Sequence, residues 1–290
     1  MSAAMKQLLD ILDLERIENN VFRGRSPQVG WQRVFGGQVV AQAMVAAQRT
    51  VAKDRHVHSI HCYFLRPGDP EVPIEYHVDT LRNGLSFTTR RVVAKQRDKA
   101  IFSLAGSFQV DEQGLEHFIP APLNIPTPDE LKGDLERVQE IKDSLPEQIR
   151  KYWGKERPFE LRPVSLKHYV SRDPLPPRQD MWLKATGSVP DDRALQSAIL
   201  GYLSDMTLLD TSLFAHGKSI FDGDLQVASL DHSMWFHRKP DLKNWLLYTQ
   251  DSPNSSGARG LTRGCLYGED GTLIASVAQE GLIRPRMPKK

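Results

Sequence analysis

The sequence predicts an α+β fold built from two similar halves, each consisting of a central helix wrapped by an antiparallel sheet. A helix-like segment at residues 38–47 is followed by four strand-like segments, and the same order of segments recurs from residue 194 onward. The closing strands of the two series also align, because Ala105-Gly-Ser-Phe-Gln109 matches Ala275-Ser-Val-Ala-Gln279. Duplication has a physical reason, since one curled sheet leaves an open edge that a second copy can pair with and cover.

The first half begins with apolar residues at helical spacing in residues 1–18, which predict an amphipathic helix. The segment 38–47 is rich in small and apolar residues and follows Gly36-Gly37, so it predicts a tightly enclosed helix with the glycines at its start. Turn signals then separate four predicted strands, and the strongest of these signals is Asn83-Gly84. The four strands cover residues 57–66, 74–81, 86–96 and 100–110.

The second half repeats this order with a longer and more polar helix, predicted at residues 194–209. In its first strand, His232-Ser233 echoes His58-Ser59 of the first half. Asp270-Gly271 predicts the hairpin turn before the last strand. The four predicted strands cover residues 229–238, 245–251, 259–267 and 272–283.

The stretch between the halves breaks the pattern. Four closely spaced prolines favour an extended connection, and helical spacing of apolar residues at 127–144 predicts one packed helix within it. We expect this stretch to connect the halves without contributing chemistry. The predicted division is an N-terminal domain at 1–115, a linker with a helix at 116–165 and a C-terminal domain at 166–290, which carries the catalytic residues.

Composition restricts the function. Lys and Arg number 38 against 36 Asp and Glu among 290 residues, a balance that gives no basic excess for binding nucleic acid. The two cysteines, Cys62 and Cys265, are too few for a disulfide framework, which favours a reducing compartment. No apolar run approaches the roughly 18 residues that a membrane span requires. We therefore expect a cytoplasmic protein with no membrane span.

Common catalytic and cofactor motifs are missing from the sequence. It contains no Gly-x-Ser-x-Gly, no Gly-x-Gly-x-x-Gly, no phosphate-binding loop and no His-Glu-x-x-His. His56, His58 and His61 cluster, but no carboxylate or thiolate is spaced to complete a metal site with them. We expect neither a metal nor a cofactor.

Three polar residues stand where ordinary core packing does not explain them. Asp205 follows an apolar run in the second helix, and a carboxylate buried there is costly unless it is paired. Gln279 lies among apolar residues of the last strand, where a buried amide needs partners, and Ser229 begins the first strand of the second half. The three could form a hydrogen-bond network without catalysis, or they could hold one water against an electrophilic carbonyl. A thioester suits the second possibility, because thiolate is a good leaving group.

The sequence resembles the acyl-CoA thioesterase II family over nearly its whole length. Together the shared motifs are highly specific, although any one alone would be weak. They are Arg33-Val-Phe-Gly-Gly-Gln-Val39, His58-Ser59, Tyr63-Phe-Leu-Arg-Pro-Gly-Asp69, Gly187-Ser-Val-Pro-Asp-Asp192, Gly201-Tyr-Leu-Ser-Asp205, Leu230-Asp-His-Ser-Met-Trp-Phe-His-Arg238, Ser255-Ser-Gly-Ala-Arg-Gly260 and Gln279-Glu-Gly281.

The resemblance implies two fused hotdog domains, each an antiparallel sheet around a central helix. It also implies that an Asp, a Thr or Ser, and a Gln of the second half hold the hydrolytic water, at positions that match Asp205, Ser229 and Gln279. Threonine is familiar at the middle position, and serine lacks the methyl group that restricts the side chain. Gly36 and Gly37 are candidates for polarising the thioester oxygen through backbone N–H groups, although packing explains them equally well.

His58 is a further candidate for substrate contact, although a hydrogen bond within the sheet would also account for it. The expected reaction is hydrolysis of medium- to long-chain acyl-CoA by a direct attack of water. A hotdog scaffold also hosts acyl-CoA hydration or dehydration, and a non-enzymatic acyl-CoA binder is the third possibility. Sites and not folds carry function, so the fold alone does not decide among them. We expect a homo-oligomer, either a dimer or a tetramer.

Overall fold

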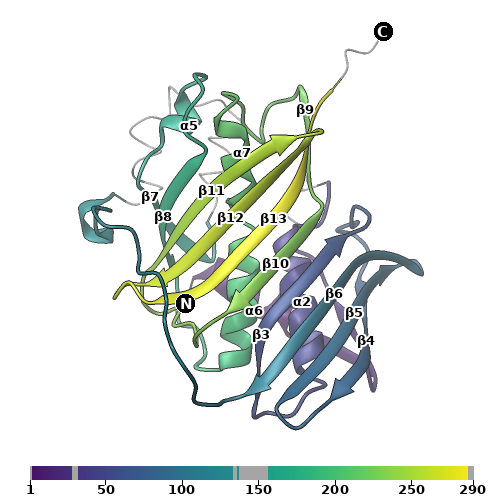
Figure 1. Ribbon diagram of the computed structural model, residues 1–290. Helices are drawn as coiled ribbons and strands as arrows, with labels where there is room; N and C mark the ends of the chain where they lie inside the picture. Colours follow the sequence, from purple (N-terminus) through teal and green to yellow (C-terminus); the bar gives the residue numbers. More distant parts are fainter. Residues whose placement is uncertain (1, 28–31, 133–135, 137–155, 287–290) are drawn as a thin grey trace.

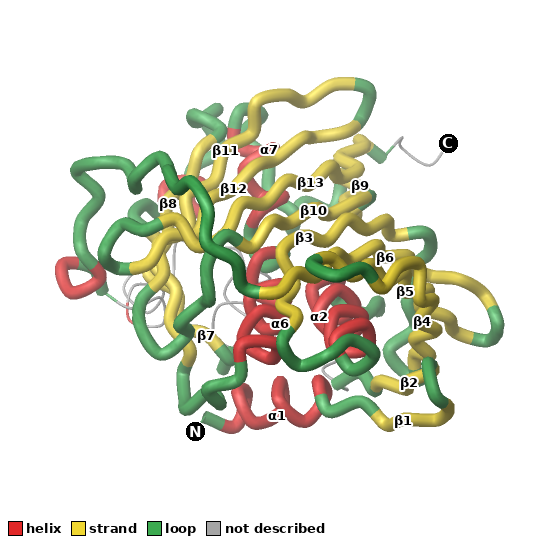
Figure 2. The backbone as a smooth tube through the Cα atoms, turned by 60° about the horizontal axis from the view of Figure 1, so that its bottom comes forward, coloured by secondary structure: helices red, strands yellow, loops and turns green. Residues whose placement is uncertain are grey.

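The computed structural model of the protein describes residues 2–27, 32–132, 136 and 156–286. Within them, antiparallel strands form one 13-stranded sheet that arches over two neighbouring helices, α2 and α6 (Figures 1 and 2). A further helix, α1, lies beneath these two (Figure 2). None of the helices in the described part of the chain has both the length and the apolarity needed to cross a membrane.

The first half supplies one side of the sheet and the helix beneath it. α1 is capped by Ser2, whose hydroxyl accepts from the Met5 N–H, and it buries Met5, Leu8 and Leu12 against the core. The elements of this half are α1 (Ala3–Leu12), β1 (Glu15–Glu18), β2 (Val21–Gly24), α2 (Gly36–Gln48), β3 (Arg55–Phe64), β4 (Ile74–Asn83), β5 (Phe87–Gln96) and β6 (Lys99–Val110).

The second half supplies the other side. Asp192 caps α6 by accepting from the Leu195 N–H at 2.9 Å. The elements of this half are η1 (Pro128–Glu130), β7 (Phe159–Pro163), α5 (Lys167–Val170), β8 (Arg178–Ala185), α6 (Arg193–Ser204), η3 (Leu208–Asp210), α7 (Thr211–Phe214), β9 (Leu225–Ser229), β10 (Asp231–Phe236), β11 (Leu246–Ser256), β12 (Arg259–Gly268) and β13 (Leu273–Pro285).

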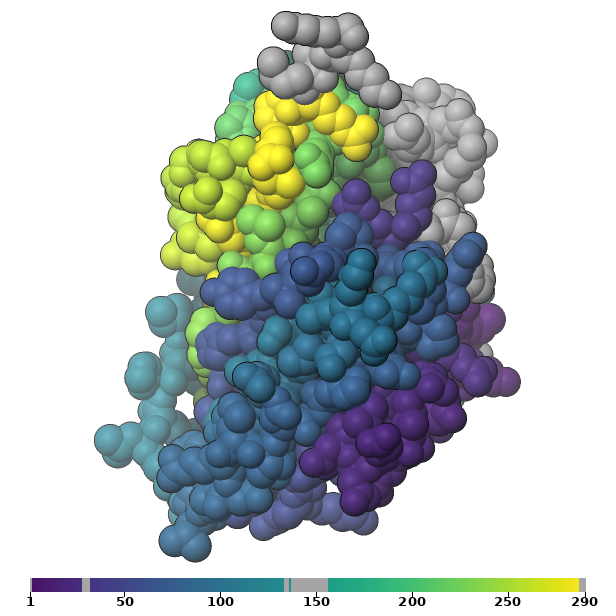
Figure 3. All heavy atoms as spheres, turned by 90° about the vertical axis from the view of Figure 1, so that its right-hand side faces the viewer, coloured from purple at the N-terminus to yellow at the C-terminus, as the bar shows by residue number. Residues whose placement is uncertain are grey.

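The halves join through one strand of each, β3 and β10. β3 and β10 pair antiparallel from Asp231 opposite Tyr63 to Trp235 opposite Ser59, so the two sheets continue as one. The strand order is β1-β2-β4-β5-β6-β3-β10-β13-β12-β11-β8-β7, with β9 pairing to β13. Figure 3 shows both halves on one face, the first in purple and blue and the second in green and yellow. Each half thus closes the open edge of the other.

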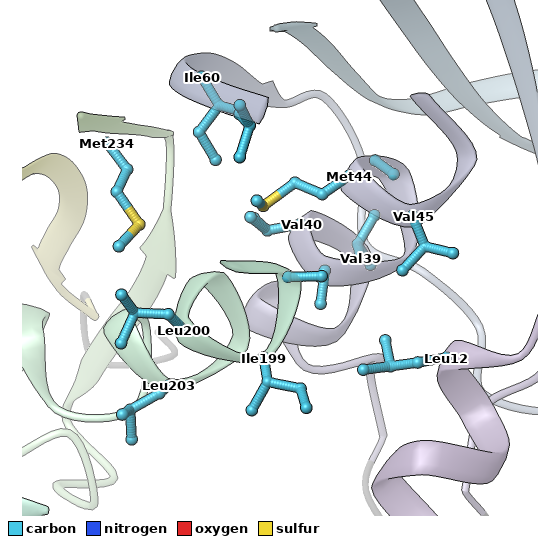
Figure 4. Packing of buried hydrophobic residues seen from close by; sticks show 14 of the residues in the cluster. Leu12, Val39, Val40, Met44, Val45, Ile60, Ile199, Leu200, Leu203 and Met234 are labelled. Atoms are coloured by element: carbon cyan, nitrogen blue, oxygen red, sulfur yellow. The ribbon is translucent and has the colours of Figure 1, made fainter. Parts of the chain in front are cut away.

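The core lies between the sheet and the paired helices. In Figure 4, Val40 and Met44 of α2 lie below Ile60 of the sheet, and Leu200 of α6 lies below Met234; all belong to one buried cluster. Burying each such side chain contributes roughly 1.5–3 kcal/mol relative to leaving it exposed. Gly201 permits the close approach of the helices, because a Cβ there would lie 2.8 Å from the Met44 sulfur. This packing holds the C-terminal end of α6 against the N-terminal end of α2.

Several predicted elements differ from the structure. The helix predicted at 1–18 ends at Leu12, and β1 follows it as an exposed edge strand whose charged residues gave no alternating pattern. The helix predicted at 194–209 ends at Ser204. The strand predicted at 229–238 is two strands, because its pairing with β13 shifts register between Ser229 opposite Gly281 and Ser233 opposite Ala278. Strands β2, β7 and β8 were not predicted, and β7 lies inside the segment predicted as a linker. Most of the helix predicted at 127–144 lies outside the described residues, which here are 127–132 and 136. The start of this segment forms η1.

Candidate active site

The site forms where the end of α6 meets the start of α2. Asp205 is the C-cap residue of α6, one residue beyond the last helical position. A Cβ at Gly36 would lie 2.6 Å from Asp205 Oδ2, and one at Gly37 would lie 2.5 Å from the Tyr202 carbonyl oxygen. Only glycine allows this approach, so the close contact between α2 and the end of α6 explains why both positions are glycine. The structure also confirms that α2 begins at these glycines.

Asp205 is surrounded by donors. The Gly37 N–H, the Ser229 hydroxyl and the Gln279 amide all donate to its carboxylate. The N-terminus of α2 adds the positive end of a helix dipole, which favours the ionised form. The structure therefore brings five of the six predicted site residues together, namely Gly36, Gly37, Asp205, Ser229 and Gln279.

Gln279 connects the other two members of the predicted trio. Its Nε2 atom donates to Asp205 Oδ1 at 3.0 Å and to Ser229 Oγ at 2.9 Å. Ser229 ends β9 opposite Gly281 of β13, so the hydroxyl and the amide come from neighbouring strands. Gln279 itself is 1% exposed, and this contact pattern uses both protons of its amide.

Burial changes the acidity of Asp205. Loss of water around the carboxylate raises its pKa from the ordinary value to about 7, and the hydrogen bonds from Gln279, Gly37 and Ser229 only partly oppose this. Asp205 nevertheless keeps partial solvent exposure. A carboxyl group with a pKa near neutrality is suited to accept a proton from water and to return it later.

One residue outside the predicted site extends the hydrogen-bond network, and a second carboxyl group lies close enough to feel its charge. His232 is fully buried, with Nδ1 at 3.0 Å from Gln279 Oε1 and Nε2 at 2.9 Å from Ser204 Oγ. Asp210, just beyond α6, has a pKa raised to about 7 by burial and by the charge of Asp205. His232 occupies the position in the repeat that matches His58, but the sequence could not reveal which side chains would contact it in the fold.

The structure does not bring His58 to this site. His58 lies on β3, several residues before the position that pairs with β10 near Asp231. Its Nε2 atom contacts Ser107 Oγ at 2.8 Å, and its ring packs edge-on against Phe87. These contacts match the alternative stated for His58 from the sequence, a hydrogen bond within the sheet.

Two depressions in the described part of the surface lie away from this site. One, of about 360 Å³, is lined by residues 121–129, Trp182 and the turn at 268–271. The other contains Arg172 and Lys218, which pair with Asp222 and Asp224 and thus have their charges balanced. Among the described residues, no group of three or more His, Cys, Asp or Glu side chains is arranged to hold a metal ion.

Gly36→Ala tests the contact between α2 and Asp205. The new methyl group would meet Asp205 Oδ2 and the ring of Phe64, so the carboxylate must move away from Ser229 and Gln279. We expect kcat for the reaction of this site to fall by about 10²-fold, as displacements near 1 Å do in positioned sites. Steady-state kinetics measures this, with Gly114→Ala as the control, because a Cβ there meets nothing within 4 Å. Equal kcat values for both variants would contradict the proposed contact.

Comparison with known proteins places this geometry in a family. A model of the acyl-CoA thioesterase family matches residues 150–282, and a model of the acyl-CoA thioesterase N-terminal domain matches residues 22–109. The chain is 42% identical to acyl-CoA thioesterase 2 of Haemophilus influenzae over 284 residues, which cover 98% of this chain and 99% of that relative.

Solved structures agree. Acyl-CoA thioesterase II TesB2 from Mycobacterium marinum superposes with a TM-score of 0.78 at 39% identity, over 96% of this chain and 98% of that one. A conserved protein with a hotdog fold from Alicyclobacillus acidocaldarius gives a TM-score of 0.78 at 15% identity, over 97% of this chain and 99% of that one. The second match bears on the fold alone, and it confirms the predicted double-hotdog architecture.

Proposed function

The chain belongs to the acyl-CoA thioesterase family and hydrolyses acyl-CoA, and from this premise we propose that Asp205, Ser229 and Gln279 hold the attacking water. One observation carries the proposal: a single buried amide, that of Gln279, bridges the Asp205 carboxylate and the Ser229 hydroxyl. The three groups offer acceptors and donors on one side of a partly exposed carboxylate. A water in their midst would be oriented as well as activated.

The reaction follows from these groups without a covalent intermediate. Asp205 takes a proton from the water as the water oxygen bonds to the thioester carbon. The resulting oxyanion is stabilised by the positive end of the α2 dipole, although one N–H group there, that of Gly37, is bonded to Asp205. Collapse of this intermediate breaks the carbon–sulfur bond, and the departing CoA thiolate takes the proton back from Asp205. The products are the free acid and CoA, and the carboxylate is restored.

A pH profile tests the ionisation of Asp205. The carboxylate must be charged to accept a proton, and its pKa is raised to about 7. We therefore expect kcat/KM to fall about tenfold per pH unit below this pKa and to level off above it. Rates measured in buffers of constant ionic strength, with folding checked by circular dichroism, provide the profile. A profile that stays flat down to the ordinary Asp pKa of about 4 would contradict the assignment.

We further propose that the substrates carry medium to long acyl chains. Apolar side chains border the trio: Phe64 stands next to Gly36, and Leu209 packs on Gly281 opposite Ser229. Thiol release from a panel of acyl-CoA esters, from butyryl to stearoyl, measures the preference. We expect kcat/KM to be higher for decanoyl and longer chains than for butyryl-CoA. The fastest release from the shortest ester would contradict this proposal, and CoA release itself separates hydrolysis from hydration and from binding alone.

We also propose the domain bounds, the oligomeric state and the cellular location of the protein. The domains are taken to be residues 1–115 and 166–290, as the repeat in the sequence suggests, with a connection at 116–165 whose strand β7 pairs with β8 of the second domain. The chain is taken to form a homo-oligomer, a dimer or a tetramer, which light scattering coupled to size-exclusion chromatography would measure. A cytoplasmic location is supported by two cysteines that are both free, Cys62 and Cys265.

A further inference from the structure

We infer that His232, held in place by Ser204, sets the orientation of the Gln279 amide so that its NH₂ group and not its oxygen faces Asp205 and Ser229. His232 acts through Gln279 and is therefore a positioning residue. The inference rests on the proposed role of the trio. It adds that His232 and Ser204 hold the Gln279 amide in the orientation that the trio requires.

An amide side chain does not hold its own orientation by shape. The oxygen and the NH₂ group of Gln279 have nearly the same size, so only polar partners decide which one points toward Asp205. In the structure, Nε2 donates to Asp205 Oδ1 and Ser229 Oγ, while Oε1 lies 3.0 Å from His232 Nδ1. Rotation by half a turn would set the oxygen against a carboxylate and would set two donors against each other.

The contacts determine the tautomer of His232. Gln279 Oε1 can only accept, so the proton must be on His232 Nδ1. Nε2 is then the acceptor, and the Ser204 hydroxyl at 2.9 Å must turn its single proton toward Nε2 and away from the Gly201 carbonyl oxygen, which lies 3.0 Å from it. Burial lowers the pKa of His232 to about 4, so the ring is neutral at the pH of catalysis. The neighbouring Cys62 thiol donates to the backbone carbonyl oxygen of His232 and not to its ring.

The network forms a closed loop. Ser204 and Asp205 are consecutive residues at the end of α6, and the path from one to the other runs through His232 on β10 and Gln279 on β13. Ser204 and His232 are fully buried and Gln279 is 1% exposed, so solvent does not compete with these bonds. The loop therefore couples the position of the carboxylate to the orientation of the amide.

Two substitutions of the histidine separate positioning from packing. In His232→Asn the side-chain NH₂ group can take the place of Nδ1–H and donate to Gln279, whereas in His232→Gln the polar end reaches toward Ser204 and that donor is lost. We expect kcat to fall by about 10²-fold in His232→Gln and by less than about tenfold in His232→Asn, with KM unchanged in both. The acid limb of the pH profile should move to higher pH in His232→Gln only, because a free amide no longer stabilises ionised Asp205.

Equal losses in the two variants, or unchanged kcat and acid limb in folded His232→Gln, would overturn the inference. If His232→Gln fails to fold, Ser204→Ala decides: lowered kcat at unchanged KM supports the relay, and unchanged kcat overturns it. Asp205→Asn distinguishes a failure of the proposed catalytic trio from a failure of the role proposed for His232. An active Asp205→Asn enzyme would refute the proposed trio itself, whereas an inactive one together with a normal His232→Gln enzyme would refute only the role of His232.

Discussion

Asp205→Asn is expected to lower kcat for acyl-CoA hydrolysis by about 10³-fold, within the range that general base groups contribute. Asparagine has nearly the same shape and can still contact Ser229 and Gln279, but it cannot take a proton from water. The effect should appear in kcat and not in KM, since the carboxylate acts on the water and not on CoA. Thiol release under saturating acyl-CoA measures it.

Asp210 provides the matched control. It is close enough to Asp205 to feel its charge, and its pKa is also raised to about 7, yet none of its described side-chain contacts involves Ser229 or Gln279. We expect Asp210→Asn to keep kcat within about tenfold of the wild type, as a group outside the proton-transfer path should. A large loss of kcat in Asp210→Asn together with full activity in Asp205→Asn would show that Asp210, and not Asp205, is the general base.

The same Asp205→Asn substitution should stabilise the fold at high pH. The pKa of Asp205 is higher in the folded state than the unfolded value of about 3.9, so the unfolded chain releases this proton first as the pH rises. Ionisation between that value and about 7 therefore lowers the free energy of unfolding. Asparagine has no such ionisation, so the Tm of the variant should exceed that of the wild type at about pH 8 and match it at about pH 4. Calorimetry at both pH values measures this.

Gln279→Met should have the second largest effect, a fall in kcat of about 10²- to 10³-fold, comparable to the loss of one essential donor in other hydrolytic sites. Methionine fills a similar volume but donates to neither Asp205 nor Ser229. It also leaves the Nδ1–H of His232 without its acceptor, so a loss of stability accompanies the loss of rate. Steady-state kinetics and thermal unfolding should be measured on the same samples.

Gln179→Met is the control for a buried glutamine outside the site. Gln179 lies on β8 and is 5% exposed, and neither polar atom of its side chain has a hydrogen-bond partner in the described structure. We expect its replacement to leave kcat unchanged and to preserve the fold. If Gln279→Met were as active as Gln179→Met, the amide bridge would have no part in catalysis.

The sequence was sufficient for the architecture and for most strands. Strand-like runs bounded by turn signals, and their recurrence in the second half, predicted β3 to β6 and β10 to β13. These signals failed at β1, whose four residues are all exposed, and at the short strand β7, where no pattern could develop. Strand β9 was merged with β10, because both pair with β13 and the sequence pattern does not reveal where the register of that pairing shifts.

Prediction of the candidate site had a similar limit. Asp205 stood out because a carboxylate in an apolar helix needs an explanation, although the helix in fact ends one residue earlier. Gln279 stood out for the same reason in a strand. His232 did not, because its importance depends on contacts with Ser204 and Gln279, which lie 28 and 47 residues away in the chain. Only the packing of α6 under β10 and β13 brings these side chains together.

The central claim is that water attacks the thioester directly, and a single turnover in oxygen-18-labelled water with enzyme in excess tests it most directly. Direct attack predicts that the label enters the released fatty acid, that the peptide containing Asp205 stays unlabelled, and that acid quenching traps no acyl group on the protein. Label in the Asp205 carboxyl group, or an acyl adduct in the intact mass, would show that Asp205 attacks the thioester itself and would contradict the mechanism.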